Sequence, residues 1–203
     1  LEGQISLGDG TLNTDLDITR LDGPGGQLAL QAAYSNATTQ LDLDLSLQEP
    51  ADGVVANLID IPERPPVSLT LAGGGQLDDL DLELAFDVDS RRIATGSFRL
   101  SDNLLTDDRR AELRLSGPLS SILPQQHRAF FGAETSIESD MILRNGGGLD
   151  LQRFEFGGGA LSISASGSTL ADWFPRELIA DISMRSNDGS PVRLPVSGEA
   201  VTV

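Results

Sequence analysis

Carboxylates recur at every second position in two stretches of the chain, as Asp42 and Asp44 and as Asp79, Asp81 and Glu83. Carboxylate oxygens suit hard cations such as Ca²⁺. Carboxylates two residues apart on a straight strand project in parallel, however, and do not converge on one ion. The chain also lacks a twelve-residue calcium loop with a central Gly and a terminal Glu. We therefore interpret these residues as the solvated face of two strands and predict no metal site.

Groups that could act in catalysis are scarce. His127 is the only histidine, it lies beside Arg128 with no serine nucleophile elbow nearby, and the chain has no Cys. A general base without a partner nucleophile does not make an active site, and neither thiolate chemistry nor a Cys/His metal site is possible without those residues. We expect a surface or capping histidine, no catalytic residue, no cofactor and no enzymatic activity.

Three triglycine segments, at residues 73–75, 146–148 and 157–159, resemble phosphate-binding loops only superficially. None is followed by the Lys-Ser/Thr pair of a P-loop, and none lies between a predicted strand and a predicted helix. Glycine adopts positive φ without strain. The three segments are therefore predicted to be turns.

Composition narrows the class of partner. The chain has 203 residues and a net charge of −17, and all 14 basic residues are arginine. Such a balance disfavours binding to phosphate backbones or to anionic lipids through a basic patch. Aromatic residues make up only 4% of the chain, which disfavours base stacking. We therefore expect no nucleic-acid partner. Hydrophobic residues make up 39% of the chain, which is enough to form a core.

The clearest structural signal is residues 80–88, Leu-Asp-Leu-Glu-Leu-Ala-Phe-Asp-Val, in which every even position is apolar and every odd position except Ala85 is acidic. Alternation with a period of two places apolar and charged side chains on opposite faces of a strand. Similar patterns predict further strands at residues 5–7, 12–18, 27–34, 39–47, 67–71, 93–100, 111–115, 135–144, 149–156, 160–166 and 178–184.

The order of these elements repeats. Residues 47–100 and 115–170 both give a strand, a short helical segment (50–61 and 117–132), a strand, a triglycine and two more strands. We expect one elongated segment with approximate units at 1–46, 47–114, 115–169 and 170–203. Two aromatic pairs, Phe130-Phe131 and Trp173-Phe174, are expected to plug an end or an edge of the apolar sheet, or to act as a gate.

These features predict an all-β protein with a few short helices, in which a curved antiparallel or mixed sheet folds into a hydrophobic groove. The groove would be either filled by its own side chains or open as a channel for apolar ligands. No apolar run reaches the ~18 residues of a membrane span. The alternating pattern at both ends suggests a piece of a longer β protein, and bare sheet edges would favour self-association of the fragment.

Several segments resemble the repetitive body of TamB-type translocation-and-assembly proteins of the AsmA-like group. They are residues 65–84 (Pro-Pro-Val-Ser-Leu-Thr-Leu-Ala-Gly-Gly-Gly-Gln-Leu-Asp-Asp-Leu-Asp-Leu-Glu-Leu), 94–98, and Leu123-Pro124 followed by 127–132. The resemblance implies a β-taco, a curved sheet folded into a groove, in the periplasm of a Gram-negative bacterium. Such proteins are anchored in the inner membrane. They are associated with phospholipid movement between the membranes and with outer-membrane protein assembly beside an Omp85-type partner, which would be contacted through regions outside this segment.

On this interpretation the alternating apolar residues line a conduit for phospholipid acyl chains. A structural or adhesive extracellular β-solenoid with a filled core is the alternative. The candidate lining residues are Leu41, Leu43, Leu45, Leu69, Leu71, Leu80, Leu82, Leu84, Phe86, Val88, Phe98, Leu113, Leu115, Met141, Leu143, Leu161 and Ile163.

Overall fold

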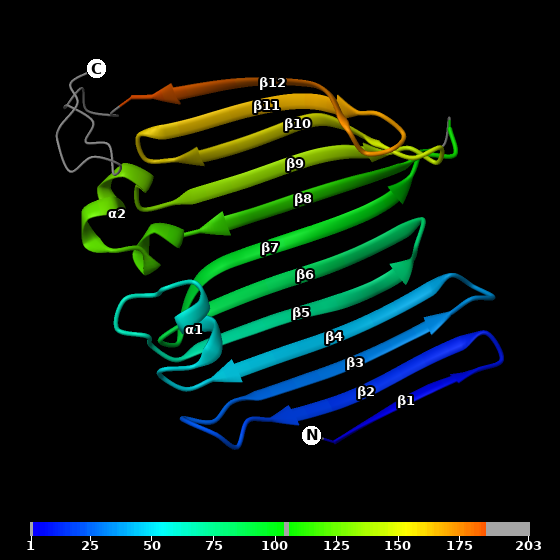
Figure 1. Ribbon diagram of the computed structural model, residues 1–203, viewed down its shortest axis with the longest axis horizontal. Coiled ribbons are helices and arrows are strands. Elements are labelled where there is room, and N and C mark those ends of the chain that lie inside the picture. The colour runs from blue at the N-terminus through cyan, green and yellow to red at the C-terminus, as the bar shows by residue number, and fades with distance from the viewer. Residues whose placement is uncertain (1, 104–105, 186–203) are drawn as a thin grey trace. The chain divides into compact units, whose positions relative to one another are not determined.

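The computed structural model describes residues 2–103 and 106–185 (Figure 1). These residues form twelve strands, two short α-helices and one 3-10 helix, so the all-β prediction is confirmed. Contacts within the chain divide it into two compact units, Leu1–Ser101 (unit 1) and Asp102–Val203 (unit 2). The unit boundaries predicted from the repeat pattern stay a prediction.

Unit 1 is an antiparallel meander in which each strand pairs with the next one along the chain. Two-residue turns with positive φ join several strands, as at Asp9-Gly10 and Asp89-Ser90, and such turns match the right-handed twist of a hairpin. Its strands are β1 (Glu2–Gly8), β2 (Thr11–Thr19), β3 (Gln27–Ser35), β4 (Gln40–Glu49), β5 (Val67–Gln76), β6 (Asp79–Val88) and β7 (Arg91–Asp102).

The first triglycine of the chain is part of a strand, and its prediction as a turn was wrong. Gly73, Gly74 and Gly75 lie inside β5 and pair with β4 on one side and β6 on the other. Gly73 and Gly75 have φ of 149° and 147°. A Cβ atom at Gly75 would lie 2.1 Å from the carbonyl oxygen of Asp79. Glycine is therefore required here by close backbone approach within the sheet.

The helix predicted within residues 50–61 is the short α1 (Val54–Leu58) between β4 and β5. Glu49, at the end of β4, is buried and accepts a 2.7 Å hydrogen bond from the backbone N–H of Val55. This carboxylate satisfies one of the N–H groups that lack a partner in the first turn of a helix. Ala56 is fully buried, so one side of this short helix is covered.

Unit 2 is a second antiparallel meander, with its helical segment after the first strand. The unit thus repeats the order strand, helix, strand, strand, strand that β4 to β7 show in unit 1, as predicted. Its elements are β8 (Arg109–Gly117), the 3-10 helix η1 (Leu119–Ile122), α2 (Gln125–Phe131), β9 (Thr135–Leu143), β10 (Leu149–Gly158), β11 (Leu161–Thr169) and β12 (Pro175–Met184).

Helix α2 packs against the end of the sheet in unit 2. The ring of Phe131 meets that of Phe156 in β10 edge to face at a centroid distance of 6.3 Å. The carbonyl of Phe130 accepts a 2.8 Å hydrogen bond from the N–H of Ala160, just before β11. The predicted packing of the Phe130-Phe131 pair over an end of the sheet agrees with these contacts.

The remaining predictions for unit 2 have mixed outcomes. Residues 146–148 form a turn as predicted, whereas in 157–159 only Gly159 lies in the turn, because β10 continues to Gly158. Trp173-Phe174 was expected to plug an end or an edge of the sheet or to act as a gate, and these residues form the exposed turn between β11 and β12. The strand predicted at 178–184 is β12, and the continuation predicted at 191–203 lies outside the described residues.

Candidate functional site

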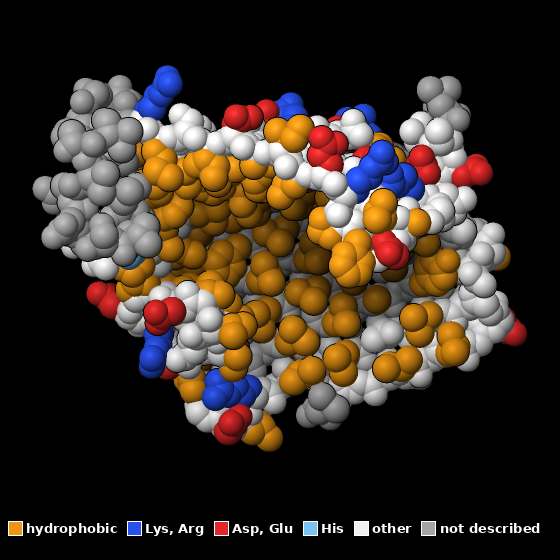
Figure 2. All heavy atoms as spheres, turned by 45° about the horizontal axis from the view of Figure 1, so that its top comes forward, with side chains coloured by type: hydrophobic (Ala, Val, Ile, Leu, Met, Phe, Trp, Pro, Cys, Tyr) orange, Lys and Arg blue, Asp and Glu red, His pale blue; other side chains and the backbone are white. Residues whose placement is uncertain are grey.

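The predicted lining residues of unit 1 all lie on one face of its sheet. The register aligns Leu43, Gly73, Leu82 and Phe98 in a single row across four strands, and the alternation of strand side chains extends this face along each strand. This apolar face carries all eleven candidates, which are Leu41, Leu43, Leu45, Leu69, Leu71, Leu80, Leu82, Leu84, Phe86, Val88 and Phe98. Figure 2 shows hydrophobic side chains gathered over the strands.

These side chains are covered only in part. Leu80 and Val88 are 4% and 6% exposed, whereas the other nine candidates of unit 1 are half-buried. A fully packed core residue touches neighbours on all sides and is almost completely buried. The apolar face of unit 1 is therefore covered for the greater part, but nine of its eleven candidate side chains keep some exposed surface.

The six candidates in unit 2 also share one face. Leu115 pairs with Ile137, and Ile137 and Ile163 both pair with Phe156, so the apolar rows run from β8 to β11. Leu113 is 38% exposed and the rest are half-buried. The candidates on the apolar face of unit 2 are Leu113, Leu115, Met141, Leu143, Leu161 and Ile163.

Sequence reasoning missed other members of both faces. In unit 1 the register adds residues of β2, β3, β4 and β7, and in unit 2 it adds residues of β9 and β10. The signal that identifies them is the same two-residue alternation. The additional half-buried apolar residues are Leu16, Ile18, Leu28, Leu30, Leu47, Leu100, Ile137, Leu151, Phe154 and Phe156.

The apolar face of unit 1 has a gap in its side-chain layer. Gly73 lies between Leu43 and Leu82, and Gly75 lies between Leu41 and Leu80, so two successive positions on this face carry no side chain. Neighbouring strands are about 4.8 Å apart, and alternate residues about 6.8 Å. Two successive positions of this face thus carry no side chain, and the leucines on either side belong to strands roughly 10 Å apart.

The opposite face of each unit is polar and carries cross-strand ion pairs. Arg99 in β7 donates two hydrogen bonds of 2.7 and 2.8 Å to Asp81 in β6. These hydrogen bonds, together with the positive charge of Arg99, hold the pKa of Asp81 below its ordinary value. In unit 2, Arg110 pairs with Asp140 from Nε at 2.9 Å, which raises the pKa of the guanidinium. The solvated face predicted for the carboxylates is present: Asp42, Asp44, Asp79, Asp81 and Glu83 are all exposed.

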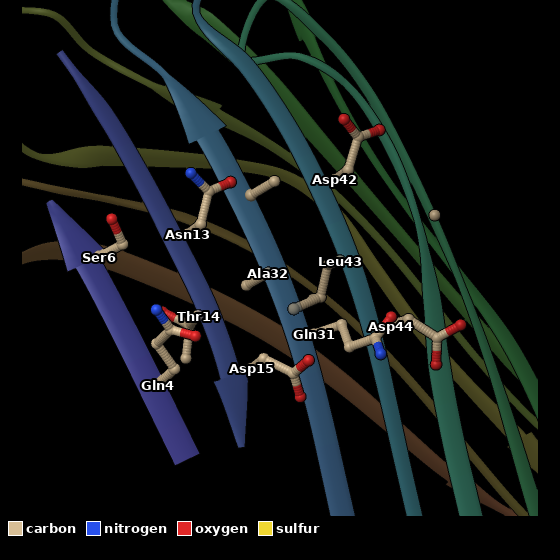
Figure 3. A pocket seen from close by; sticks show the side chains of 12 residues that line it. Gln4, Ser6, Asn13, Thr14, Asp15, Gln31, Ala32, Asp42, Leu43 and Asp44 are labelled. Carbon is tan, nitrogen blue, oxygen red and sulfur yellow. The ribbon is translucent and has the colours of Figure 1, made fainter. Parts of the chain in front are cut away.

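An open depression of about 520 Å³ lies on the polar face of unit 1 (Figure 3). Asp15, Gln31 and Asp44 form one cross-strand row in it, and Asn13 and Asp42 lie in the next row. Within the described ranges, no group of three or more His, Cys, Asp or Glu side chains could hold a metal ion. Most of its lining residues belong to the solvated face, and Leu43 and Gly73 also line it.

His127, the single histidine, lies half-buried in α2. Its Nε2 atom is 3.4 Å from Nε2 of Gln126, and its Nδ1 atom has no hydrogen-bond partner. Among the residues that the structure describes, its hydrogen-bond contact is to Gln126, which is neither an activated nucleophile nor a His, Cys or carboxylate ligand for a metal.

Two further results concern membrane-spanning helices and similarity to known proteins. None of the helices within residues 2–103 and 106–185 combines the length and hydropathy needed to cross a membrane. Comparisons of the chain with protein-family models, with curated proteins and with solved structures found no match.

Proposed function

We propose that the apolar faces of the two units bind lipid acyl chains, and that the protein is a segment of a periplasmic conduit that shields those chains between the inner and outer membranes. The observation that carries this proposal is the layer of half-buried leucines on the apolar face of unit 1, which no second layer among the described residues covers completely. Large exposed apolar surfaces usually mark binding sites in soluble proteins.

The chemistry of this face fits an aliphatic chain. Of its eleven candidate residues, eight are leucine, and leucine side chains adapt their rotamers to a flexible ligand without demanding a flat ring. Each CH₂ group of a lipid gains about 0.8 kcal/mol on leaving water. An acyl chain of sixteen carbons therefore meets a barrier on the order of 12 kcal/mol in crossing water unaided. A continuous apolar surface lowers that barrier along the route.

Among the described residues, the polar faces offer few free cations that could bind the phosphate of a lipid head group. The chain has no Lys, and Arg99, Arg110 and Arg153 are paired with carboxylates across their strands. An arginine that already donates to a carboxylate offers less to a phosphate group. The proposal is thus that the acyl chains lie on the apolar face while the head group stays in water.

The cellular setting is proposed from the resemblance to TamB-type proteins. On that basis the full-length protein is anchored in the inner membrane, lies in the periplasm, contributes to outer-membrane protein assembly and pairs with an Omp85-type partner outside this segment. An adhesive β-solenoid with a filled core remains the competing function, and the half-buried leucines favour the conduit, since a filled core would bury them.

A photo-crosslinking experiment tests the proposal. The photoreactive amino acid p-benzoylphenylalanine is placed at Leu82 or Leu84, and in a matched control at Glu83 between them, whose side chain points to the polar face. We expect lipid adducts by mass spectrometry from the two leucine positions and none from Glu83. Leu82→Arg should remove lipid that co-purifies with the chain while the circular dichroism of the sheet is retained. Equal labelling at all three positions, or none, would exclude the conduit.

A further inference from the structure

The turn between β11 and β12 presents the most exposed aromatic side chains of unit 2. Trp173 and Phe174 are 59% and 68% exposed, and Leu170 beside them is 48% exposed. The turn lies at an end of the strands, apart from the rows of the apolar face. Exposing the only tryptophan of the chain with a phenylalanine and a leucine costs solvation free energy, and such a cluster is typical of a binding surface.

The turn is held in one conformation. The N–H of Leu170 donates to the carbonyl of Phe174 at 2.8 Å, and the N–H of Trp173 donates to the carbonyl of Leu170 at 3.0 Å. Trp173 has a φ of 69°, a left-handed conformation that is unfavourable for a bulky residue. These hydrogen bonds define the backbone of the turn, in which both aromatic side chains are exposed.

The turn that contains Gly147 and Gly148 contacts the turn between β11 and β12. Gly147 and Gly148 approach it so closely that a Cβ atom on either would lie 2.5 Å from the carbonyl oxygen of Ala171 or Leu170. Thr169 adds a second connection, since its Oγ1 atom accepts a 2.8 Å hydrogen bond from the N–H of Leu149. The apolar tip thus rests on a rigid base formed by the two turns.

Size and charge indicate which partner fits. At about 150–250 Å² for a complete aromatic side chain, the three residues expose roughly 300 Å², well below the ~800 Å² per partner of a stable protein interface. A lipid interface has no minimum contact area of this kind: Trp is enriched at the membrane–water interface, and binding there grows with each apolar side chain that is buried. The charged neighbours Asp172, Arg176 and Glu177 do not form a basic cluster, and the chain carries a charge of −17.

We propose that Leu170, Trp173 and Phe174 dock the protein onto an electrically neutral lipid surface by inserting into its head-group region. The proposal does not depend on acyl chains binding to the apolar face. Because the protein is strongly acidic, a zwitterionic surface is preferred over an anionic one.

Trp173 is itself the reporter for the test. The purified 203-residue chain is titrated with phosphatidylcholine vesicles, and we expect a blue shift of the Trp173 emission and quenching by lipids brominated near the head group. Phe174→Ser and Leu170→Ser should each weaken vesicle binding by roughly tenfold, the loss expected for part of one buried apolar side chain. Leu21→Ser is the matched control, because Leu21 is 92% exposed in a turn of unit 1 without aromatic neighbours.

Two results would overturn the proposal. They are an unshifted Trp173 emission that stays accessible to acrylamide, and stronger binding to phosphatidylglycerol vesicles than to phosphatidylcholine. The Leu82→Arg variant separates this proposal from the conduit, since vesicle docking should persist when uptake of acyl chains by the apolar face is lost.

Discussion

Gly73 of β5 lies directly opposite Leu82 of β6, and a Cβ atom at Gly73 would lie 2.2 Å from the carbonyl oxygen of Asp81. With φ at 149°, the backbone at Gly73 is also in a region that other residues rarely adopt. We expect Gly73→Ala to lower the free energy of unfolding by at least ~2 kcal/mol, through strain and displacement of the strand. Urea unfolding followed by circular dichroism measures the change.

The control for this substitution is Gly8→Ala at the end of β1. An added Cβ there meets no atom within 4 Å, and Gly8 does not have a positive φ. Its effect should stay within about 0.5 kcal/mol, as for most surface substitutions. If the two alanine variants were equally stable, β5 could not follow the backbone path described.

A second prediction concerns the energy of the aromatic contact between α2 and β10. Phe131 and Phe156 meet edge to face, an arrangement worth about 0.5–1.5 kcal/mol beyond area burial. A double-mutant cycle with Phe131→Leu and Phe156→Leu should therefore give a coupling energy of about 1 kcal/mol in unfolding experiments. Phe154 lies on the same strand and face, and its cycle with Phe131 is the control, for which we expect additivity. Zero coupling for the Phe131 and Phe156 pair would mean that α2 is held by its backbone contacts alone.

Local alternation was sufficient to predict most of the fold. Leu80, Leu82 and Leu84 alternate with carboxylates, and a one-residue shift in register would move all three leucines to the polar side. The pattern therefore determines both the presence of the strand and the face of the sheet on which its leucines lie. For the same reason the seventeen candidates fall on one face within each unit. The role of that face in lipid binding stays a prediction.

What could not be predicted depends on contacts between residues distant in sequence. A run of three glycines by itself predicts a turn. Only the close approach of β6 to β5 explains why residues 73–75 belong to a strand. Trp173-Phe174 resembled Phe130-Phe131 in composition, but the turn at 169–174 is fixed by contacts with residues 144–149 that no local pattern reveals. The absence of side chains between the leucines of β4 and β6 likewise becomes evident only once the register is known.

The ion pair between Asp81 and Arg99 predicts a small dependence of stability on pH. Its hydrogen bonds lower the pKa of Asp81 in the folded state, so the pair stabilises the protein above the unfolded pKa of about 3.8, and this contribution is lost as the pH falls through the lower folded value. Both side chains are more than half exposed, which limits the effect to about 0–1 kcal/mol. Titration of the Asp81 carboxyl carbon by NMR should give a midpoint below 3.8.

A variant series tests the same pair by unfolding. Asp81→Asn should be less stable than the native chain at pH 7 in low salt, and the difference should vanish near pH 2 and shrink in 1 M NaCl. Glu83→Gln removes a carboxylate from the same face of the same strand and serves as the comparison. A difference that persisted unchanged at pH 2 would show that Asp81 acts through packing rather than through charge.

Among the described residues one edge of β12 is unpaired, which predicts self-association of the chain. The N–H of Arg185 donates to the carbonyl of Ala160 at 2.8 Å. In an antiparallel ladder the bonded residues alternate, so the backbone groups of Ile182 and Leu178 point away from β11. No strand of the described residues pairs with that side. Both side chains are also more than 60% exposed, which makes β12 a long apolar edge without a lysine to protect it.

Substituting Ile182 by lysine should therefore suppress self-association, because a charge on an edge strand opposes pairing with another chain. Sedimentation velocity of the native chain should show a weight-average sedimentation coefficient that rises with protein concentration, and Ile182→Lys should flatten this dependence. Leu21→Lys adds the same charge in a turn of unit 1, away from any strand edge, and should leave the dependence unchanged. If both variants behaved alike, net charge rather than the edge of β12 would control association. If Ile182→Lys had no effect, contacts through the apolar faces would be the cause, and Leu82→Arg should then reduce them.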